Sequence, residues 1–407
     1  MSQVTTKTTR FSKLNNAPIE LLYVNNDLEP LSTAYLLSLL NRGKSLSEIR
    51  LQANTLKSFY EYSIEFDLDF PSCFKRMEQI PSGTIEHLAA YISTRKDTGE
   101  IVAAGTFDYR WKHIKSFLIH VWRFYQERLV DPNSLKAAQV KQEVMRESLK
   151  EYGRFGYKAD RPDKIGLSPE LKIEFFNIIH PGKHNELNPW KSEIVRWRNY
   201  CLFLTMILGG NRKGESLLLK VADFSLTGPA SQPRYFEFRK TSTVTTEYGE
   251  RRIKPSAKTK GRRVELHPVL ADVFDYYISK VRPKFKGART FNNMFLSFKD
   301  GQPMGITAPN QALDDIINAY PQFKGRLSPH ILRNTWSDSV RNVLDAKYEH
   351  LGPLARQGLV ASAMEYGGGW ARGSEQVDRY PKGAIERRMA EVHMLVQGEI
   401  LSERENS

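Results

Sequence analysis

The stretch LGGNRKGESLLLKVADF, residues 208–224, follows a segment over residues 193–208 whose apolar residues recur at helical spacing. Two glycines stop that helix, because glycine is favoured just past a helix end. We expect Asn211 to cap a new helix that carries Arg212 and Glu215. Arg212 would then lie where backbone N–H groups already favour an anion, and Glu215 can hold its guanidinium group or pack structurally.

The segment SPHILRN, residues 328–334, has the same design. Ser328 can cap a helix and Pro329 suits the first turn, which places His330 and Arg333 on one face. Histidine can exchange a proton with an attacking or leaving oxygen, while arginine supplies a fixed charge. The alternative is a structural histidine at a helix start.

A different pattern occurs between these two segments. Residues 235–238 and 262–266 alternate in the manner of strands, with threonines at 243–246 between them, which predicts a small antiparallel sheet inside a helical domain. Lys260 would lie at the tip of this hairpin, where a lysine among cations can protonate a departing hydroxyl. Lys258 competes with it for this role.

Tyr380 ends a short helical segment and precedes a proline, which places its hydroxyl at an edge suited to a nucleophile. A free phenol has a pKa of about 10, so it needs nearby cations to attack as a phenolate. Tyr366 is its nearest rival. Trp370, after three glycines, can donate its indole N–H to a phosphate oxygen or pack at the edge of a core.

These segments, in this order, resemble the motifs of the tyrosine recombinases, the phage integrase family, across about residues 165–385. LGGNRKGESLLLKVADF resembles the first arginine motif, KGRRVELHP the hairpin motif, HILRN the His-x-x-Arg motif, and GGWARGSEQVDRY the final motif. The lysine-to-proline spacing of the hairpin motif favours Lys260 over Lys258. The resemblance implies a mainly α fold with a small antiparallel β-sheet, in which a helical core-binding domain precedes an α+β catalytic domain.

The resemblance also implies a mechanism without a metal or another cofactor. Tyr380 would attack a DNA phosphate and form a 3′-phosphotyrosyl link, and Arg212 and Arg333 would stabilise the transition state. Lys260 would act as general acid. The implied catalytic set is Arg212, Lys260, His330, Arg333, Trp370 and Tyr380, with Glu215 in support. The implied partners are double-stranded DNA at specific sites, further copies of the chain in a tetramer, and accessory DNA-bending proteins.

The composition agrees with a polyanionic partner. The chain has 407 residues, enough for two or three domains, and 60 Lys and Arg against 46 Asp and Glu give a net charge of +14. Its two cysteines, Cys73 and Cys201, are far apart and exclude a disulfide framework or a zinc module. With no apolar run long enough for a membrane span, we expect a cytoplasmic, DNA-associated protein.

Four regions are predicted along the chain: a loosely ordered polar arm over residues 1–28, a helical DNA-binding domain over 29–150, a linker over 151–164, and the catalytic domain over 165–407. In the second region, a helix near residues 106–128 carries basic residues around an apolar stripe. They either track a DNA backbone or form a solvated face. The residues expected to contact DNA are Arg110, Lys112, Lys115, Arg123, Lys258 and Arg262. After Tyr380, a helical stripe suited to docking on a neighbouring copy comprises Ile385, Met389, Val392 and Val396.

Three other functions are weighed against recombination. A type IB topoisomerase shares nearly all these groups, and a non-catalytic accessory protein would keep the fold and the basic surface. A metal-dependent nuclease would need clustered carboxylates, whereas Glu215 and Asp223 are interpreted as structural. The sequence does not distinguish integration of a mobile element from excision, inversion or resolution.

Overall fold

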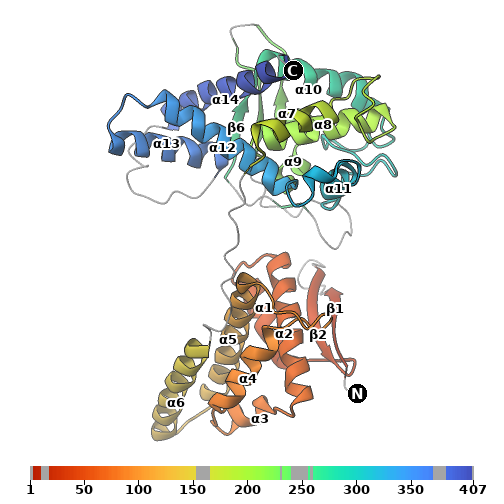
Figure 1. The fold of residues 1–407 in the computed structure, drawn as a ribbon. Coiled ribbons are helices and arrows are strands. Elements are labelled where there is room, and N and C mark those ends of the chain that lie inside the picture. The colour runs from red at the N-terminus through yellow and green to blue at the C-terminus, as the bar shows by residue number, and fades with distance from the viewer. Residues whose placement is uncertain are drawn as a thin grey trace. The chain divides into compact units, whose positions relative to one another are not determined.

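The structure is a computed structural model that describes residues 3–10, 18–152, 166–229, 232–239, 255–256, 260–369 and 382–405. The chain divides into two compact units, residues 1–162 and 163–407 (Figure 1). This division falls inside residues 151–164, the predicted linker. The two units are described separately below as unit 1 and unit 2.

Unit 1 begins with a three-stranded antiparallel sheet and not with the loosely ordered arm predicted for residues 1–28. Its strands, in spatial order, are β1 (Val4–Arg10), β2 (Pro18–Val24) and β3 (Asp27–Leu28). The polar composition of β1 suggested an arm, but β2 supplies Ile19, Leu21 and Leu22, all fully buried. The sheet packs on helix α2, and the burial of these apolar side chains stabilises it.

The rest of unit 1 is helical, as predicted. Ser45 caps α2 by accepting a hydrogen bond from the backbone N–H of Glu48 at 3.2 Å. Phe59, Phe70 and Phe117 from three helices meet edge to face in the core. The helices are α1 (Pro30–Asn41), α2 (Leu46–Glu65), α3 (Phe70–Lys75), α4 (Ser82–Ile92), α5 (Ala104–Gln126) and α6 (Pro132–Glu151).

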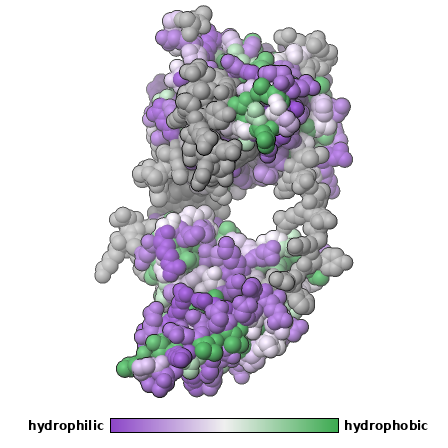
Figure 2. All heavy atoms as spheres, turned by 90° about the vertical axis from the view of Figure 1, so that its left-hand side faces the viewer, coloured by the Kyte–Doolittle hydropathy of each residue, from purple (hydrophilic) through white to green (hydrophobic). Residues whose placement is uncertain are grey.

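The surface of unit 1 is mostly hydrophilic on the face shown in Figure 2, with an apolar strip among the polar residues. On α6, Val140 and Val144 are exposed while Met145 and Leu149 are buried. The helix therefore has an inner face in the core and a partly apolar outer face.

Unit 2 is built from helices around a second small sheet (Figure 1). Its strands are β4 (Phe224–Ser225), β5 (Tyr235–Phe238) and β6 (Arg262–Glu265), in that spatial order and antiparallel. Strands β5 and β6 confirm the predicted hairpin pair, β4 was not predicted, and residues 243–246 lie outside the described part. The helices are α7 (Pro169–Ile179), α8 (Glu193–Ile207), α9 (Lys213–Leu218), α10 (Pro268–Tyr276), α11 (Ala308–Ala319), α12 (Pro329–Lys347), α13 (Pro353–Gly368) and α14 (Lys382–Glu405), and the short 3-10 or π turns are η3 (Val221–Asp223), η5 (Tyr277–Val281), η6 (Arg282–Lys284) and η7 (Pro321–Phe323).

Helix α8 is the centre of unit 2, because every residue from Arg198 to Ile207 is buried. Helix α12 packs on it, and α13 and α14 pack on α12. The predicted fold class, mainly α with a small antiparallel sheet, is therefore confirmed, and the sheet of unit 1 is a second one that was not predicted. Over the described ranges, no helix is both long and apolar enough to cross a membrane.

Three residues of the predicted stripe on α14 pack inside their own unit and not on a neighbouring copy as predicted, and the side chain of the fourth, Ile385, lies outside the described residues. Met389, Val392 and Val396 are at most 1% exposed and belong to the core of unit 2. Gln397 fixes the helix to the end of β6: its side chain accepts from the backbone N–H of His267 at 2.6 Å and donates to the carbonyl of Glu265 at 2.8 Å. The apolar stripe was correctly identified, but its period does not reveal which surface covers it.

Candidate functional site

The start of α9 differs from the prediction in one detail. Arg212, and not Asn211, is the capping residue, and the Glu215 carboxylate accepts a hydrogen bond from the Arg212 backbone N–H at 3.0 Å. The fully buried Asn211 side chain instead accepts from the Arg262 guanidinium at 2.6 Å. A bond from a charged donor is stronger than one from a backbone N–H, which explains why Asn211 turns inward.

Three guanidinium groups gather around Glu215. Its Oε1 lies 3.3 Å from Arg212 Nη1, and its Oε2 lies 3.1 Å from Arg262 Nη2 and 3.8 Å from Arg333 Nη1. The side chains of Glu215 and Arg262 are 0% exposed and that of Arg333 is 5% exposed, whereas Arg212 is 35% exposed. We call these four residues the arginine cluster. Arg212 is its most accessible cation.

Arg333 is held by backbone groups as well. Ser328 caps α12 by accepting from the backbone N–H of Ile331 at 3.2 Å, which confirms the predicted helix start. The Arg333 side chain donates to the carbonyl of Gly210 and, at 2.7 Å, to that of Gly368. His330, three residues earlier, is exposed. The two side chains predicted to share one face therefore differ in depth.

Burial and charge make the arginine cluster receptive to an anion. Burial, followed by the neighbouring charges of Arg212 and Arg262, lowers the pKa of Arg333 to about 9, and the attraction of Glu215 is a smaller effect. The repulsion between cations therefore outweighs the compensation from the shared carboxylate. A phosphate near Arg212 and Arg333 would relieve this repulsion and match the planar donors of guanidinium.

Gly210 links two of the arginines through one oxygen. Its carbonyl accepts from Arg333 and, at 3.3 Å, from Arg262. Its φ of +63° is one that side-chain-bearing residues rarely adopt, and a Cβ there would lie 2.4 Å from the Trp336 ring. A glycine is therefore required at this point by both the backbone conformation and the packing.

Lys260 lies beside the same region, two residues before the start of β6. Its backbone N–H donates to the carbonyl of Gly369 at 3.0 Å, and the residue is exposed. The end of α13 is thus tied to Lys260 through Gly369 and to Arg333 through Gly368. The residue after Gly369 is Trp370. Trp370, Tyr380 and Lys258 lie outside the described residues, and the structure leaves their predicted roles untested.

Arg262 was predicted to contact DNA, and the structure corrects this prediction. Its side chain is 0% exposed and is bonded to Gly210, Asn211 and Glu215. The adjacent Arg263 is half-buried and stacks on the Tyr235 ring at 3.6 Å. Strand alternation sends neighbouring side chains to opposite faces, so only one of the two can enter the core.

The two acidic residues interpreted as structural from the sequence, Asp223 and Glu215, both hold neighbouring groups of the chain. Asp223 accepts from the backbone N–H of Lys220 at 2.8 Å at the start of η3, and burial raises its pKa. Glu215 is the shared partner of the arginines. Among the described residues, no three His, Cys, Asp or Glu side chains come together as a metal site.

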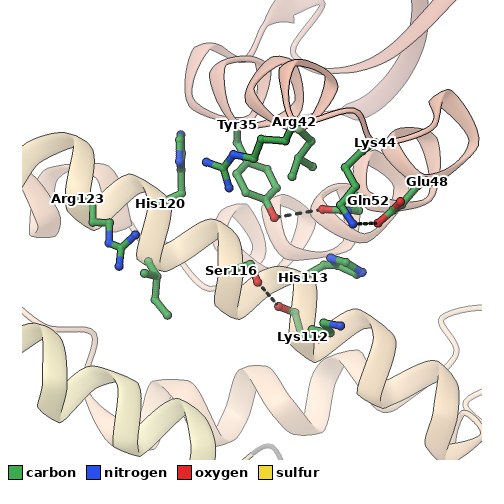
Figure 3. A pocket seen from close by; sticks show the side chains of 12 residues that line it. Tyr35, Arg42, Lys44, Glu48, Gln52, Lys112, His113, Ser116, His120 and Arg123 are labelled. Carbon is green, nitrogen blue, oxygen red and sulfur yellow. Dashed lines mark hydrogen bonds and ion pairs between the residues drawn. The ribbon is translucent and has the colours of Figure 1, made fainter. Parts of the chain in front are cut away.

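Unit 1 has a separate basic cleft of about 250 Å³ between α1, α2 and α5 (Figure 3). Arg42, at the end of α1, and His120, on α5, face each other across it. Lys44 at the rim pairs with Glu48 at 3.1 Å. The residues that line this basic cleft are Tyr35, Leu39, Arg42, Lys44, Glu48, Gln52, Lys112, His113, Ser116, Ile119, His120 and Arg123.

The basic residues predicted on α5 separate into two groups. Lys112 and Arg123 are exposed and line the basic cleft, whereas Lys115 is not among its lining residues. Arg110 is half-buried and donates to the carbonyl of Ile92 at 2.8 Å at the end of α4, so its guanidinium already has a structural partner. Of the four basic residues predicted on α5, only Lys112 and Arg123 therefore line the basic cleft.

Four residues of the basic cleft were not predicted from the sequence: Arg42, Lys44, His113 and His120. Burial, and next the charge of Lys112, lowers the pKa of His113, while burial and then Arg42 lower that of His120. The only local signal was Gly43, which ends α1 at a positive φ of +76° and directs the flanking basic residues toward α5.

No family model matches this chain, and no curated protein matches its sequence. Among solved structures, it is similar to the pre-cleavage complex of the XerH site-specific recombinase bound to its difH substrate, at 16% identity and a TM-score of 0.44, over 89% of this chain and 83% of that chain. A post-cleavage complex of XerH with a palindromic difH substrate is similar at 16% identity and a TM-score of 0.35, over 76% of this chain and 83% of that chain. Both are structures of a site-specific recombinase.

Proposed function

We propose that this chain is a site-specific DNA recombinase of the tyrosine recombinase family. It would cut and rejoin DNA strands through a 3′-phosphotyrosyl intermediate. The observation that carries the proposal is the arginine cluster, in which Arg212 and Arg333 lie on either side of one buried carboxylate. The order of the sequence motifs supports it, because Lys260, His330 and Tyr380 stand where the family places its catalytic groups.

In the proposed cleavage step, the phenolic oxygen of Tyr380 attacks the phosphorus of a DNA phosphodiester. Its proton passes to His330 or to water, the bond from phosphorus to the 5′ oxygen breaks, and that oxygen takes a proton from Lys260. In the rejoining step, a 5′-hydroxyl of a partner strand attacks the phosphotyrosyl phosphorus and Tyr380 leaves. The phosphotyrosyl ester conserves the bond energy, so no nucleotide cofactor is needed.

The arginine cluster would act on the charge that develops at phosphorus. Guanidinium groups fixed before the reaction need not reorganise when the five-coordinate state forms. Arg333 is fixed by two backbone carbonyls and Arg212 by Glu215. Losing one fixed donor of this kind costs roughly 100- to 1000-fold in rate. Trp370 would add an indole N–H, a role that follows from its position in the final motif.

Unit 1 would hold the DNA through the basic cleft. Among the described residues, its exposed cations Arg42, Lys112 and Arg123 share no carboxylate of the kind seen in unit 2, and they suit sequential phosphates of a backbone. The remaining parts of the proposal follow from the family resemblance. They are a homo-tetramer on two paired sites, accessory DNA-bending proteins, a DNA-associated location in the cytoplasm, and integration, excision or a related rearrangement of a mobile element.

The test is to trap the covalent intermediate. The full chain is incubated with a library of double-stranded oligonucleotides that carry a nick and randomised flanks, and detergent-resistant protein–DNA adducts are captured and sequenced. We expect an adduct that maps to Tyr380 and is absent in Tyr380→Phe, whose DNA binding persists. An adduct on Tyr366 would reassign the nucleophile, and no adduct with any DNA would reject the proposed chemistry.

The same library separates the proposal from its alternatives. A recovered target site with strand exchange between two duplexes supports recombination. Adducts spread over unrelated sequences, with relaxation of supercoiled plasmid and no exchange, would identify a type IB topoisomerase. Specific binding without any adduct would identify a non-catalytic DNA-binding protein.

A further inference from the structure

We infer that Arg262 is a positioning residue of the active site: it occupies the Glu215 carboxylate so that Arg212 and Arg333 stay directed at the DNA phosphate. This inference rests on the proposed function. Arg262 is not a DNA contact, since its side chain is 0% exposed. It acts through the groups that it holds.

The contacts of Arg262 converge on one nitrogen. Its Nη2 lies 2.6 Å from Asn211 Oδ1, 3.1 Å from Glu215 Oε2 and 3.3 Å from the carbonyl of Gly210. All three acceptors belong to the segment that begins α9. Arg262 therefore joins β6 to the segment that positions Arg212, across a sequence separation of about 50 residues.

Competition for Glu215 explains why this contact matters. With Arg262 at 3.1 Å from Oε2, Arg333 Nη1 stays 3.8 Å from the same oxygen, beyond hydrogen-bond distance. Without Arg262, Glu215 Oε2 would lose its nearest cation, and the buried carboxylate would draw Arg333 into a closer ion pair, because removing one partner of a buried charge is costly. The Arg333 charge would then be neutralised by Glu215 and would meet a phosphate less effectively.

Arg262 also connects the cluster with Lys260, two residues earlier. The backbone N–H of Lys260 donates to Gly369, and the neighbouring carbonyl of Gly368 accepts from Arg333. The start of β6 is thus fixed at one point by Arg262 and at another by the end of α13. Displacement of Arg262 would move the proposed general acid and the proposed phosphate donors together.

Lysine cannot replace arginine in this position. A guanidinium is a planar group whose donors are fixed relative to one another, whereas an ammonium is a point charge on a flexible chain. Arg262→Lys keeps the charge but loses the reach and geometry of Nη2. This substitution therefore separates positioning from simple charge compensation.

The experiment compares Arg262→Lys and Arg262→Met with the matched variants Arg263→Lys and Arg263→Met. Single-turnover adduct formation at saturating protein is measured with the trapped DNA site, alongside DNA affinity and thermal unfolding. We expect both Arg262 variants to lose about 10- to 100-fold in cleavage rate, in line with the loss of a positioned donor. Their DNA affinity should stay within twofold of the starting protein, and the Arg263 variants should cleave normally.

Three further measurements identify the route of the effect. If Arg262 acts through Glu215, the losses from Arg262→Met and Glu215→Gln are strongly non-additive in the double variant. Asn211→Ala, which removes one acceptor of Arg262, should give a smaller loss in the same direction. It serves as the deciding variant if the Arg262 substitutions do not fold. Binding of inorganic orthovanadate, followed by calorimetry, should weaken in parallel with the cleavage rate.

The outcomes are distinct. Normal cleavage by Arg262→Lys or by Asn211→Ala, or additive losses in the double variant, would overturn the inference while leaving the recombinase proposal intact. If the unmodified chain forms no adduct while Arg262→Lys binds orthovanadate more weakly than the unmodified chain does, the recombinase chemistry is rejected, and the role of Arg262 in positioning the anion site stands. If the unmodified chain forms no adduct and Arg262→Lys binds orthovanadate equally well, both the recombinase chemistry and the positioning role are rejected.

Discussion

The basic cleft of unit 1 and the arginine cluster of unit 2 use cations in opposite ways. In the cleft, Lys112 and Arg123 are exposed side chains that line an open surface. In the cluster, Arg262 and Arg333 are buried and directed by carbonyl and carboxylate oxygens. Mobile exposed charges suit a long polyanion, and fixed buried charges suit a single group of defined shape.

This difference leads us to expect that binding and chemistry can be separated by mutation. Contacts of exposed cations with DNA are strongly screened by salt, whereas fixed donors in a buried site are less screened. Substitutions in the cleft should change affinity and its salt dependence. Substitutions in the cluster should change the rate of strand cleavage with little effect on affinity.

The largest effect is expected for Arg333→Lys. Lysine keeps one charge but cannot bond Gly210 and Gly368 together, so cleavage should fall about 100- to 1000-fold while DNA affinity changes little. Arg341→Lys on the same helix is the control, because Arg341 is an exposed residue paired with Asp345 at 2.7 Å. A fall in affinity as large as the fall in rate would erase the distinction between the two regions.

Gly210→Ala tests how far the cluster depends on its backbone. The positive φ and the approach to Trp336 should destabilise the protein by about 2–4 kcal/mol in urea unfolding. Cleavage should be slower even at temperatures where the variant remains folded. Gly358→Ala in α13 is the control, since a Cβ there meets nothing within 4 Å and alanine favours a helix. Equal stability of both variants would show that Gly210 is replaceable.

A smaller effect is expected for Lys112→Ala combined with Arg123→Ala. Each lost phosphate contact should reduce the slope of log affinity against log salt by about 0.9, without changing the single-turnover cleavage rate at saturating protein. Lys115→Ala, on the same helix but outside the cleft, is the control. If Lys115→Ala weakens binding equally, the whole basic face and not the cleft holds the DNA.

The smallest effect concerns pH. Burial lowers the pKa of His120, and the charges of Arg42 and Arg123 lower it further, while Glu127 opposes them. His120 is therefore mostly neutral at pH 7 in the free protein. A bound phosphate would raise this pKa, so DNA binding would take up a proton. Affinity should therefore increase a few-fold as pH falls from about 8 to 6, and His120→Gln should flatten this trend. A dependence of the same size in His120→Gln would assign it elsewhere, with His113 as the next candidate.

Local chemistry in the sequence predicted a good part of the fold. Ser328 caps a helix where expected, and Ser45 and Ser168 cap helices by the same contact, because each uses a backbone N–H only three residues away. The alternation at residues 235–238 and 262–265 predicted the β5–β6 pair. The salt bridge between Arg212 and Glu215, one turn apart, was among the alternatives that the sequence left open.

The errors came from contacts between distant residues. Whether Arg262 or Arg263 enters the core depends on strand β6 meeting the start of α9, and the two arginines look alike in the sequence. The hydrogen bond from Arg110 to the Ile92 carbonyl at the end of α4 was likewise not foreseen, and the DNA contact expected of Arg110 stays a prediction. In each case the partner lies far along the chain, and no short-range pattern specifies that partner.

The N-terminal sheet has a practical consequence for anyone who shortens this protein. Removal of the N-terminal strands would take Ile19, Leu21 and Leu22 away from α2 and expose an apolar surface on unit 1. Such a fragment should aggregate during purification before any defect in DNA handling can be seen. Aggregation of a truncated form would then result from the uncovered core of unit 1 and not from the loss of a DNA contact.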